Sequence, residues 1–178
     1  MAASYKKPID LLPQLEADLK RLRKSDVLVG IQAKDTMREG QAINNASLLF
    51  IHTHGSPLRH IPARPVLEPA IKANRDIIVP PLEAAARRML AHDPAGAERA
   101  LERAGRVATS AAKRWFTDPR NHWRPLAAST IRARLRRLKG KTKKQTIAAI
   151  EAGENPFTPL VDIGRMRGAI NWVLRLVR

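Results

Sequence analysis

The sequence predicts an α+β protein in which several helices pack around a small, mostly antiparallel sheet, with an extended proline-rich connector. Two observations lead to this fold class. Helical periodicity marks residues 8–24 and 95–116, whereas strand-like runs occupy 26–32 and 170–177. A small sheet covered by amphipathic helices is typical of α+β domains.

The two helical segments differ in what they offer for packing. Pro8–Lys24 carries leucines at spacings of three, four and three, which form one apolar stripe. Ala95–Phe116 instead places mainly alanine on one face. Because alanine lets a partner helix approach closely, a neighbouring subunit is one candidate for that partner. The expected face consists of Ala97, Leu101, Ala104, Ala108, Ala111 and Trp115.

Two further helices follow from periodicity and capping. Apolar residues from Leu67 to Met89 keep a near-heptad spacing, which Pro80-Pro81 interrupts. Since proline disfavours helix at the preceding residue, we expect a break or a sharp kink there and a new helix beginning at Pro81. Residues 127–138 also form a predicted helix, with Ser129 or Thr130 as candidate caps.

The strands have different signatures. Asp26–Gln32 (D-V-L-V-G-I-Q) is a β-branched run of strand length. Residues 170–177 alternate mostly with period two, which predicts a terminal strand open to pairing.

The connector lies within Asn44–Leu67. A short apolar run ends at Gly55, a residue suited to a helix C-cap. Pro57, Pro62 and Pro65 then fix φ at three points, which predicts a stiff, extended surface segment. Such a segment suits a contact ledge, and this favours assembly over catalysis.

Composition bounds the class of protein. The chain has 178 residues, 44% of them hydrophobic, so we expect a single domain over residues 1–178, with residues 95–160 forming a helical, basic, arm-like portion. It has no cysteine, no apolar run long enough to span a membrane and no signal-peptide pattern. We therefore expect a soluble intracellular product without membrane contact.

The net charge is +17, and it is unevenly distributed. Residues 1–90 hold 14 basic against 9 acidic residues, and residues 91–178 hold 19 against 7. This asymmetry predicts contact with DNA or with an acidic protein, and a solvated basic face is the alternative. The candidate contact residues for an anionic partner are Arg132, Arg134, Arg136, Arg137, Lys139, Lys141, Lys143 and Lys144. At helical spacing, three of them (132, 136 and 139) would share a face, and no aromatic residue lies among them to read bases.

Catalytic and metal-binding patterns are weak. His52, His54 and His60 cluster, and on an extended segment the first two would point to one face, but no further ligand completes a zinc set. A polar surface or interface role is the alternative. Phosphate-binding glycine loops, paired apolar-context carboxylates and nucleophile motifs do not occur. We therefore expect no enzymatic activity, no cofactor and no bound metal.

Several segments carry a family resemblance. V-L-V-G-I (Val27–Ile31), N-A-S-L-L-F-I-H-T-H-G (Asn45–Gly55) and I-P-A-R-P-V-L (Ile61–Leu67) form one set. W-R-P-L-A-A-S-T-I-R-A-R (Trp123–Arg134) and P-L-V-D-I-G-R-M-R-G-A-I (Pro159–Ile170) form a second. Both resemble the neck, tail-completion and virion-morphogenesis proteins of tailed bacteriophages, over about half the chain.

The chain departs from the family pattern at three positions. Val66 stands where the pattern has Phe, Ile163 where it has Thr, and Met166 where it has Leu.

The resemblance implies a structural component of the phage head–tail junction, located in the virion and assembled in the host cytoplasm. It would act in the neck, joining the head connector to the tail, or in a tail-completion or terminator ring. Implied partners are other copies in a homo-oligomeric ring, adjacent head-connector and tail-tube or terminator proteins, and DNA in the channel, contacted non-specifically. The expected subunit or ring contacts are Ile61, Pro62, Ala63, Arg64, Pro65, Val66, Leu67, Asp162, Gly164, Arg165, Met166 and Ile170.

Two rival functions stay open. One is a sequence-independent nucleic-acid-binding protein, and the other is a hydrolase that uses the histidine cluster.

Overall fold

The computed structural model describes residues 12–32, 43–162 and 164–176. These residues form eight α-helices and a two-stranded antiparallel sheet, so the predicted α+β class is confirmed. They divide into two compact units, and neither is a continuous piece of chain. Unit 1 comprises residues up to 29, 74–108 and from 172 onward, and unit 2 comprises 30–73 and 109–171.

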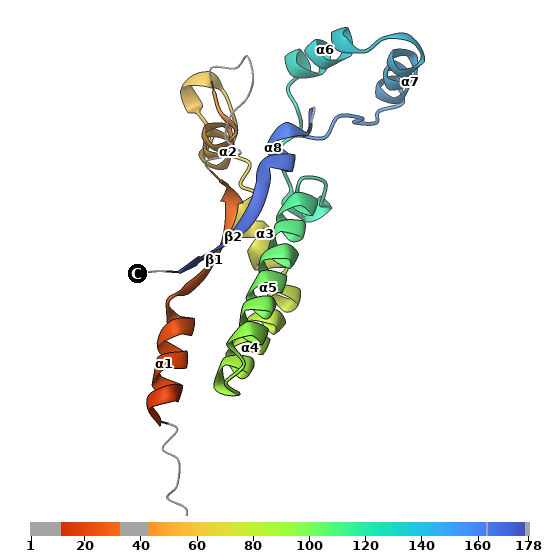
Figure 1. Ribbon diagram of the computed structural model, residues 1–178. Coiled ribbons are helices and arrows are strands. Elements are labelled where there is room, and N and C mark those ends of the chain that lie inside the picture. The colour runs from red at the N-terminus through yellow and green to blue at the C-terminus, as the bar shows by residue number, and fades with distance from the viewer. Residues whose placement is uncertain (1–11, 33–42, 163, 177–178) are drawn as a thin grey trace, which may run out of the picture. The chain divides into compact units, whose positions relative to one another are not determined.

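The sheet pairs β1 (Ser25–Ile31) with β2 (Ile170–Leu176) (Figure 1). Both strands agree with the sequence expectation. A cross-strand ion pair supports them, since the Arg175 guanidinium donates to Asp26 Oδ2 at 2.8 Å. The edge of β2 that the sequence left open to pairing is therefore satisfied on one side by β1 of the same chain.

Unit 1 is organised by α1 (Leu12–Arg23), α4 (Arg75–Leu90) and the first part of α5 (Pro94–Trp115). Its core joins Ala85 and Met89 of α4 to Ala97 and Leu101 of α5, with Leu22, Val27 and Leu174 packed against them. Figure 1 shows α4 lying alongside α5. In this unit, the alanine face thus finds its close partner helix within the chain, and no second subunit is needed to cover it.

The predicted break at Pro80-Pro81 is wrong. Helix α4 runs continuously through both prolines, and the break falls at Asn74, between α3 (Leu67–Ala73) and α4. Pro80 and Pro81 leave the carbonyls of Asp76 and Ile77 without amide donors. Both of these residues are exposed, so water can donate to the carbonyls instead.

Unit 2 begins its helices with α2 (Asn45–His54). The Asn44 side chain accepts a hydrogen bond from the Ser47 amide at 2.8 Å, and Gly55 ends the helix with φ of 76°. A Cβ on Gly55 would lie 2.9 Å from both the Ile61 carbonyl oxygen and the Ala63 nitrogen, so glycine is required there. The predicted C-cap is thereby confirmed.

The sequence predicted that the whole connector after α2 is extended. The start of the connector is not extended. Residues Pro57–Arg59 form a 3₁₀ turn, η2, which an antiparallel bridge between Ser56 and Ile61 closes. Proline at the first position of the turn provides the φ that the turn requires. Only the part beyond Ile61 runs without regular structure to α3.

The rest of unit 2 comprises the end of α5, the 3₁₀ turn η3 (Pro119–Asn121), α6 (Ala128–Arg137), α7 (Gly140–Glu151) and α8 (Arg165–Ala169). Phe116 is fully buried and meets Trp123 edge-on, with ring centroids 6.1 Å apart. The N-cap of α6 is Ala127, without a side-chain hydrogen bond, so the expected Ser129 or Thr130 cap is wrong. Among the described residues, no helix is both long enough and apolar enough to cross a membrane.

Candidate functional site: an arginine-lined pocket in unit 2

Unit 2 contains a pocket of about 1030 Å³ that brings together segments far apart in the sequence. Four of the stretches that carry the family resemblance line it, namely residues 45–55, 61–67, 123–134 and 159–170. Of the residues that line the pocket, all except Arg59 and His60 belong to these four stretches. The sequence singled out the stretches separately, and it gave no indication that they enclose one cavity.

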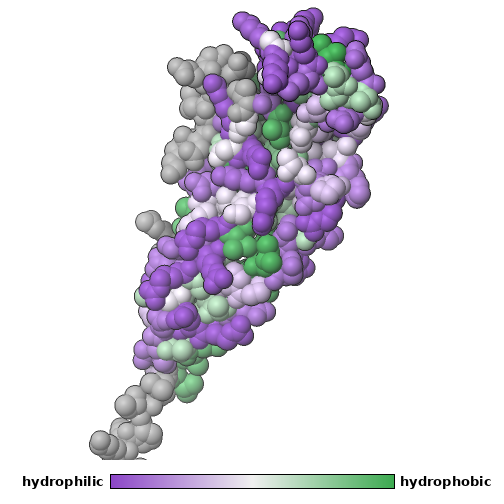
Figure 2. Space-filling model, turned by 90° about the vertical axis from the view of Figure 1, so that its right-hand side faces the viewer, coloured by the Kyte–Doolittle hydropathy of each residue, from purple (hydrophilic) through white to green (hydrophobic). Residues whose placement is uncertain are grey.

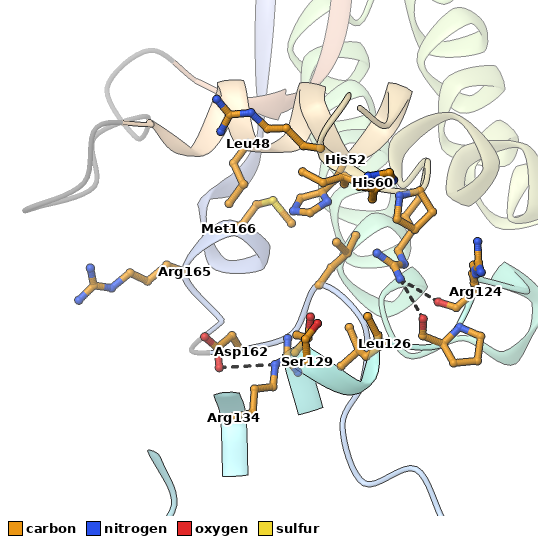
Figure 3. A pocket seen from close by; sticks show the side chains of 18 of the residues that line it. Leu48, His52, His60, Arg124, Leu126, Ser129, Arg134, Asp162, Arg165 and Met166 are labelled. Atoms are coloured by element: carbon orange, nitrogen blue, oxygen red, sulfur yellow. Dashed lines mark hydrogen bonds and ion pairs between the residues drawn. The ribbon is translucent and has the colours of Figure 1, made fainter. Parts of the chain in front are cut away.

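Apolar and basic side chains share the pocket wall. In Figure 3, His52 and Met166 face Leu126, Ser129 and Arg134 across the hollow. Met166 comes from α8 and His52 from α2, while Leu126, Ser129 and Arg134 come from the start of α6 and the segment before it. The pocket therefore depends on α2, α6 and α8 being held together.

Arg64 is the most buried charged residue of the pocket, with 6% of its surface exposed. Its Nη2 donates to the carbonyl oxygens of Arg124 at 2.8 Å and Pro125 at 3.3 Å, while its backbone amide donates to the His52 carbonyl at 2.6 Å. This one residue thus ties the I-P-A-R-P stretch to both α2 and the W-R-P-L stretch. The Nε atom of Arg64 is buried without a hydrogen-bond partner.

The surroundings of Arg64 disfavour its charge. Burial lowers its pKa, and the positive charges of Arg124 and Arg134 lower it further. Arg64 has no carboxylate partner in the part of the chain that the structure describes. Because a guanidinium stays protonated in proteins, this side chain is a buried cation balanced only by carbonyl dipoles.

Arg134 anchors the opposite wall. Its Nη1 donates to the carbonyls of Thr158 at 3.1 Å and Val161 at 2.9 Å, and its guanidinium lies 5.7 Å from the Phe157 ring centroid. Only 10% of the side chain is exposed. It therefore holds the loop before α8 rather than facing an external partner.

Among the residues that the structure describes, Asp162 is the one carboxylate that lines the pocket. The Arg137 guanidinium donates a hydrogen bond of 2.9 Å to each of the two carboxylate oxygens of Asp162. Arg134 Nε lies 4.0 Å from Asp162 Oδ1. This bidentate pair joins the P-L-V-D stretch to α6. Two of the eight basic residues predicted to contact an anion, Arg134 and Arg137, thus bind groups of the chain itself.

The other predicted anion-contact residues lie on α6, on α7 and between them. Arg132 and Arg136 lie on α6, but that helix ends at Arg137, so Lys139 does not continue their face and the predicted shared face is wrong. Leu138 and Lys139 adopt extended backbone before α7, which Gly140 begins with φ of 56°. Figure 2 shows mainly hydrophilic side chains, with some hydrophobic ones, in the region of α6 and α7. Arg134 and Lys143 are partly exposed, and the exposed members of the run are Arg132, Arg136, Arg137, Lys139, Lys141 and Lys144.

The predicted contact residues fall into two groups. Arg64, Val66, Met166 and Ile170 are buried within the chain, where they support the pocket and the neighbouring core. The others are at least partly accessible, and the prediction that they contact other subunits stands for them alone. They are Ile61, Pro62, Ala63, Pro65, Leu67, Asp162, Gly164 and Arg165.

The histidine cluster does not form a ligand set. His52 and His54 lie on α2, a helix, so their side chains diverge instead of sharing a strand face. The described residues contain no group of three side chains placed to hold a metal ion. His52 lines the pocket, and its Nδ1 is buried without a hydrogen bond. Burial, and next the charge of Arg64, lower the pKa of His52, so its ring is neutral at pH 7.

The chemistry available to the pocket is anion recognition. Five arginines line it, namely Arg59, Arg64, Arg124, Arg134 and Arg165, against the single carboxylate that Arg137 already engages. Arg59 and Arg124 were not selected from the sequence, because nothing in their local pattern distinguishes them from other surface arginines.

Comparison of the chain with protein-family models, curated proteins and solved structures gives no match in any of the three.

Proposed function

We propose that this protein is a structural component of the head–tail junction of a tailed bacteriophage, without enzymatic activity. In this role, copies of the chain form a neck, tail-completion or terminator ring around the DNA channel. The ring joins the head connector to the tail and is part of the virion.

One observation carries the proposal. The four stretches with the phage resemblance are separated by up to 55 residues of other sequence, yet they enclose a single pocket. Arg64, Arg134 and Asp162, one from each of three stretches, make the bonds that hold its walls. If the resemblance had arisen by chance in four separate stretches, we would not expect all four to line the same pocket. Their shared position therefore supports the resemblance.

The chemistry of the pocket agrees with a binding role. Its only carboxylate is held by Arg137, so neither a free general base nor a second carboxylate is present among the lining residues. Its arginines and apolar side chains instead suit contact with another molecule.

The proposal is tested by removing the gene from the phage or prophage that encodes the chain. We expect DNA-filled heads and separate tails in negative-stain images, and restoration of joined particles by the wild-type gene. Infectious particles with firmly attached tails in the deletion strain would refute the proposal.

A second candidate function, sequence-independent DNA binding, is favoured by the exposed basic residues of α6 and α7. If these residues contact phosphates, the log–log salt slope of binding to random duplex DNA is steep. Replacing Arg132, Arg136 and Lys139 by alanine would then reduce that slope by about 2.7, since each phosphate contact contributes about 0.9. A flat salt dependence would exclude this function, whatever the outcome of the gene deletion.

A further inference from the structure

The pocket of unit 2 has more positive charge than the described residues of the chain neutralise. Asp162 is satisfied by Arg137 and approached by Arg134, which leaves Arg59, Arg64, Arg124 and Arg165 without a carboxylate among the lining residues. Cations that converge on a concave surface raise the local concentration of anions there. The unpaired charge is therefore concentrated at a hollow rather than spread over a face.

The interior of the pocket also has unused hydrogen-bonding capacity. Arg64 is more than nine-tenths buried, and its Nε lacks a partner, as does the buried Nδ1 of His52. Buried polar atoms are nearly always paired in folded proteins, so the unpaired Nε–H of Arg64 indicates a place where an acceptor oxygen binds, and the unpaired Nδ1 of His52 is a second polar atom available to a ligand of the pocket. The desolvated, charge-crowded state of Arg64 fits the same interpretation.

The wall is not purely polar. Leu48, Leu126 and Met166 line the same hollow, and Met166 is itself buried. A ligand that matches this surface carries a carboxylate beside an apolar side chain. A volume of about 1030 Å³ accommodates a few residues of peptide.

Nucleic acid matches less well. No phenylalanine, tyrosine or tryptophan lines the pocket, so a single strand finds none of the usual stacking platforms. The phosphates of a duplex lie along a convex helix, whereas the inner arginine here lies at the bottom of a cavity. The exposed basic residues of α6 and α7 offer a better track for a duplex than the pocket does.

A second copy of this chain is also a poor occupant. The chain carries 33 basic against 16 acidic residues, and at least seven of its carboxylates already pair with basic side chains within the chain. Two copies therefore repel each other at long range. The occupant that this charge balance favours is a different protein with an acidic segment.

We infer that the pocket binds a short acidic and apolar segment of a different protein, with a carboxylate beside Arg64 and Arg124 and its remaining negative charge attracted by the other arginines of the pocket, Arg59 and Arg165. The inference rests on the proposed function in one respect, since the partner would be an adjacent ring of the junction. The binding itself is a property of the isolated chain.

The test uses the full-length protein and a defined probe, acetyl-Ala-Leu-Asp-Glu-Leu-Ala-amide, in calorimetric titration. Its counterpart with Asn and Gln in place of the two acids is the neutral probe. We expect the acidic probe to bind about tenfold more tightly than the neutral one, because charge-assisted pairs with arginine are lost in the latter. Equal binding of both probes, or no binding of the acidic one, would overturn the inference.

Matched variants locate the site. The rim variant R59A/R124A/R165A removes three exposed charges that line the pocket, and the control R132A/R136A/K139A removes three exposed charges of the same unit outside it. We expect binding of the acidic probe to weaken about tenfold in the rim variant and to change less than about twofold in the control. An equal loss in both variants would show attraction by net charge alone and would refute a specific site. Far-ultraviolet circular dichroism verifies that both variants are folded.

Rival occupants give distinct results. Displacement of the acidic probe by a short single-stranded oligonucleotide more effectively than by free acidic peptide would replace the inference with a nucleic-acid site. Self-association that is lost both in the rim variant and in E151Q/E154Q, which neutralises two exposed carboxylates of the chain, would assign the pocket to a second copy. Probe binding and the gene-deletion phenotype are independent, so failure of either one leaves the other interpretable.

Discussion

Arg64 shows how much of unit 2 depends on one side chain. It lies in a proline-rich stretch with no regular secondary structure, yet its amide and guanidinium donate to three carbonyls in two other segments of the chain. A planar guanidinium can serve two carbonyls at once, which an ammonium on a flexible stem does less well. The identity of this residue therefore matters beyond its charge.

We predict that Arg64→Lys lowers the free energy of unfolding by about 1–3 kcal/mol, because the buried position of Arg64 would then hold an ammonium that serves the carbonyls of Arg124 and Pro125 less well than the guanidinium does. Urea unfolding followed by circular dichroism measures the change. The control is Arg59→Lys, at an exposed arginine of the same pocket, with an expected change within about 0.5 kcal/mol. Equal stability of the two variants would contradict the structural role of Arg64.

His52 gives unit 2 a pH dependence. Its pKa in the folded state lies below the ordinary value of 6.5, so the unfolded chain takes up a proton first as the pH falls. Its contribution is thus most favourable to folding above pH 6.5 and decreases as the pH drops through that value toward the folded-state pKa. We expect wild type to lose more stability than His52→Asn between about pH 7.5 and about pH 5.5.

Urea titrations at the two pH values measure this difference. His54→Asn is the control, since His54 is exposed on the same helix, and it should keep the wild-type pH dependence. A dependence that is the same in all three proteins would show that His52 does not cause it.

Among the elements, α5 approaches β2 so closely that a side chain is excluded. A Cβ built on Gly105 would lie 2.6 Å from ring atoms of Trp172, and Arg106 covers the same ring at 6.0 Å. Glycine in a helix ordinarily costs stability relative to alanine. Here the contact with the indole reverses that preference.

We predict that Gly105→Ala lowers the free energy of unfolding by about 1–3 kcal/mol, because the indole must move from its packed position. Gly168→Ala on α8 is the matched control, since a Cβ there meets nothing within 4 Å. That control should be neutral or stabilised by up to about 1 kcal/mol. Thermal unfolding of both variants distinguishes the outcomes, and a stabilised Gly105→Ala would contradict the packing described.

Elements with strong local signals were predictable from sequence, and those decided by context were not. The leucine stripe of α1, the Gly55 cap and the alternation of β2 are local patterns, and all three are observed where they fall within the described residues. The continuity of α4 through Pro80-Pro81 was not predictable, because it depends on solvent access to two carbonyls. The pocket could not be predicted from the sequence either. It depends on hydrogen bonds of Arg64 and Arg134 to residues far away in the chain, and no local spacing of residues indicates such bonds.

For the whole molecule, the excess of positive charge governs association. A net charge of +17 on 178 residues produces repulsion between copies that salt screens, with a Debye length of about 10 Å at 0.1 M. If rings of this chain form, they need either screening or an acidic partner. Assembly is therefore coupled to the surroundings of the protein.

We predict that the purified protein has the mass of a monomer at about 50 mM salt and forms larger assemblies at about 500 mM salt, because the repulsion is then screened. Light scattering coupled to size-exclusion chromatography measures the mass at both concentrations. A large assembly at low salt that dissociates as salt is added would show the opposite, namely that ion pairs between copies hold it together.

The interleaved arrangement of the two units has a consequence for biosynthesis. Leu174 packs against the same core as Leu22 and Val27, so the interior of unit 1 cannot close until residue 174 has left the ribosome. Helices α1, α4 and α5 are translated earlier, and the apolar surface that Leu174 later covers stays exposed until then. Folding of unit 1 therefore waits for the synthesis of β2, and we expect chaperones to bind a nascent chain that is stalled before this strand.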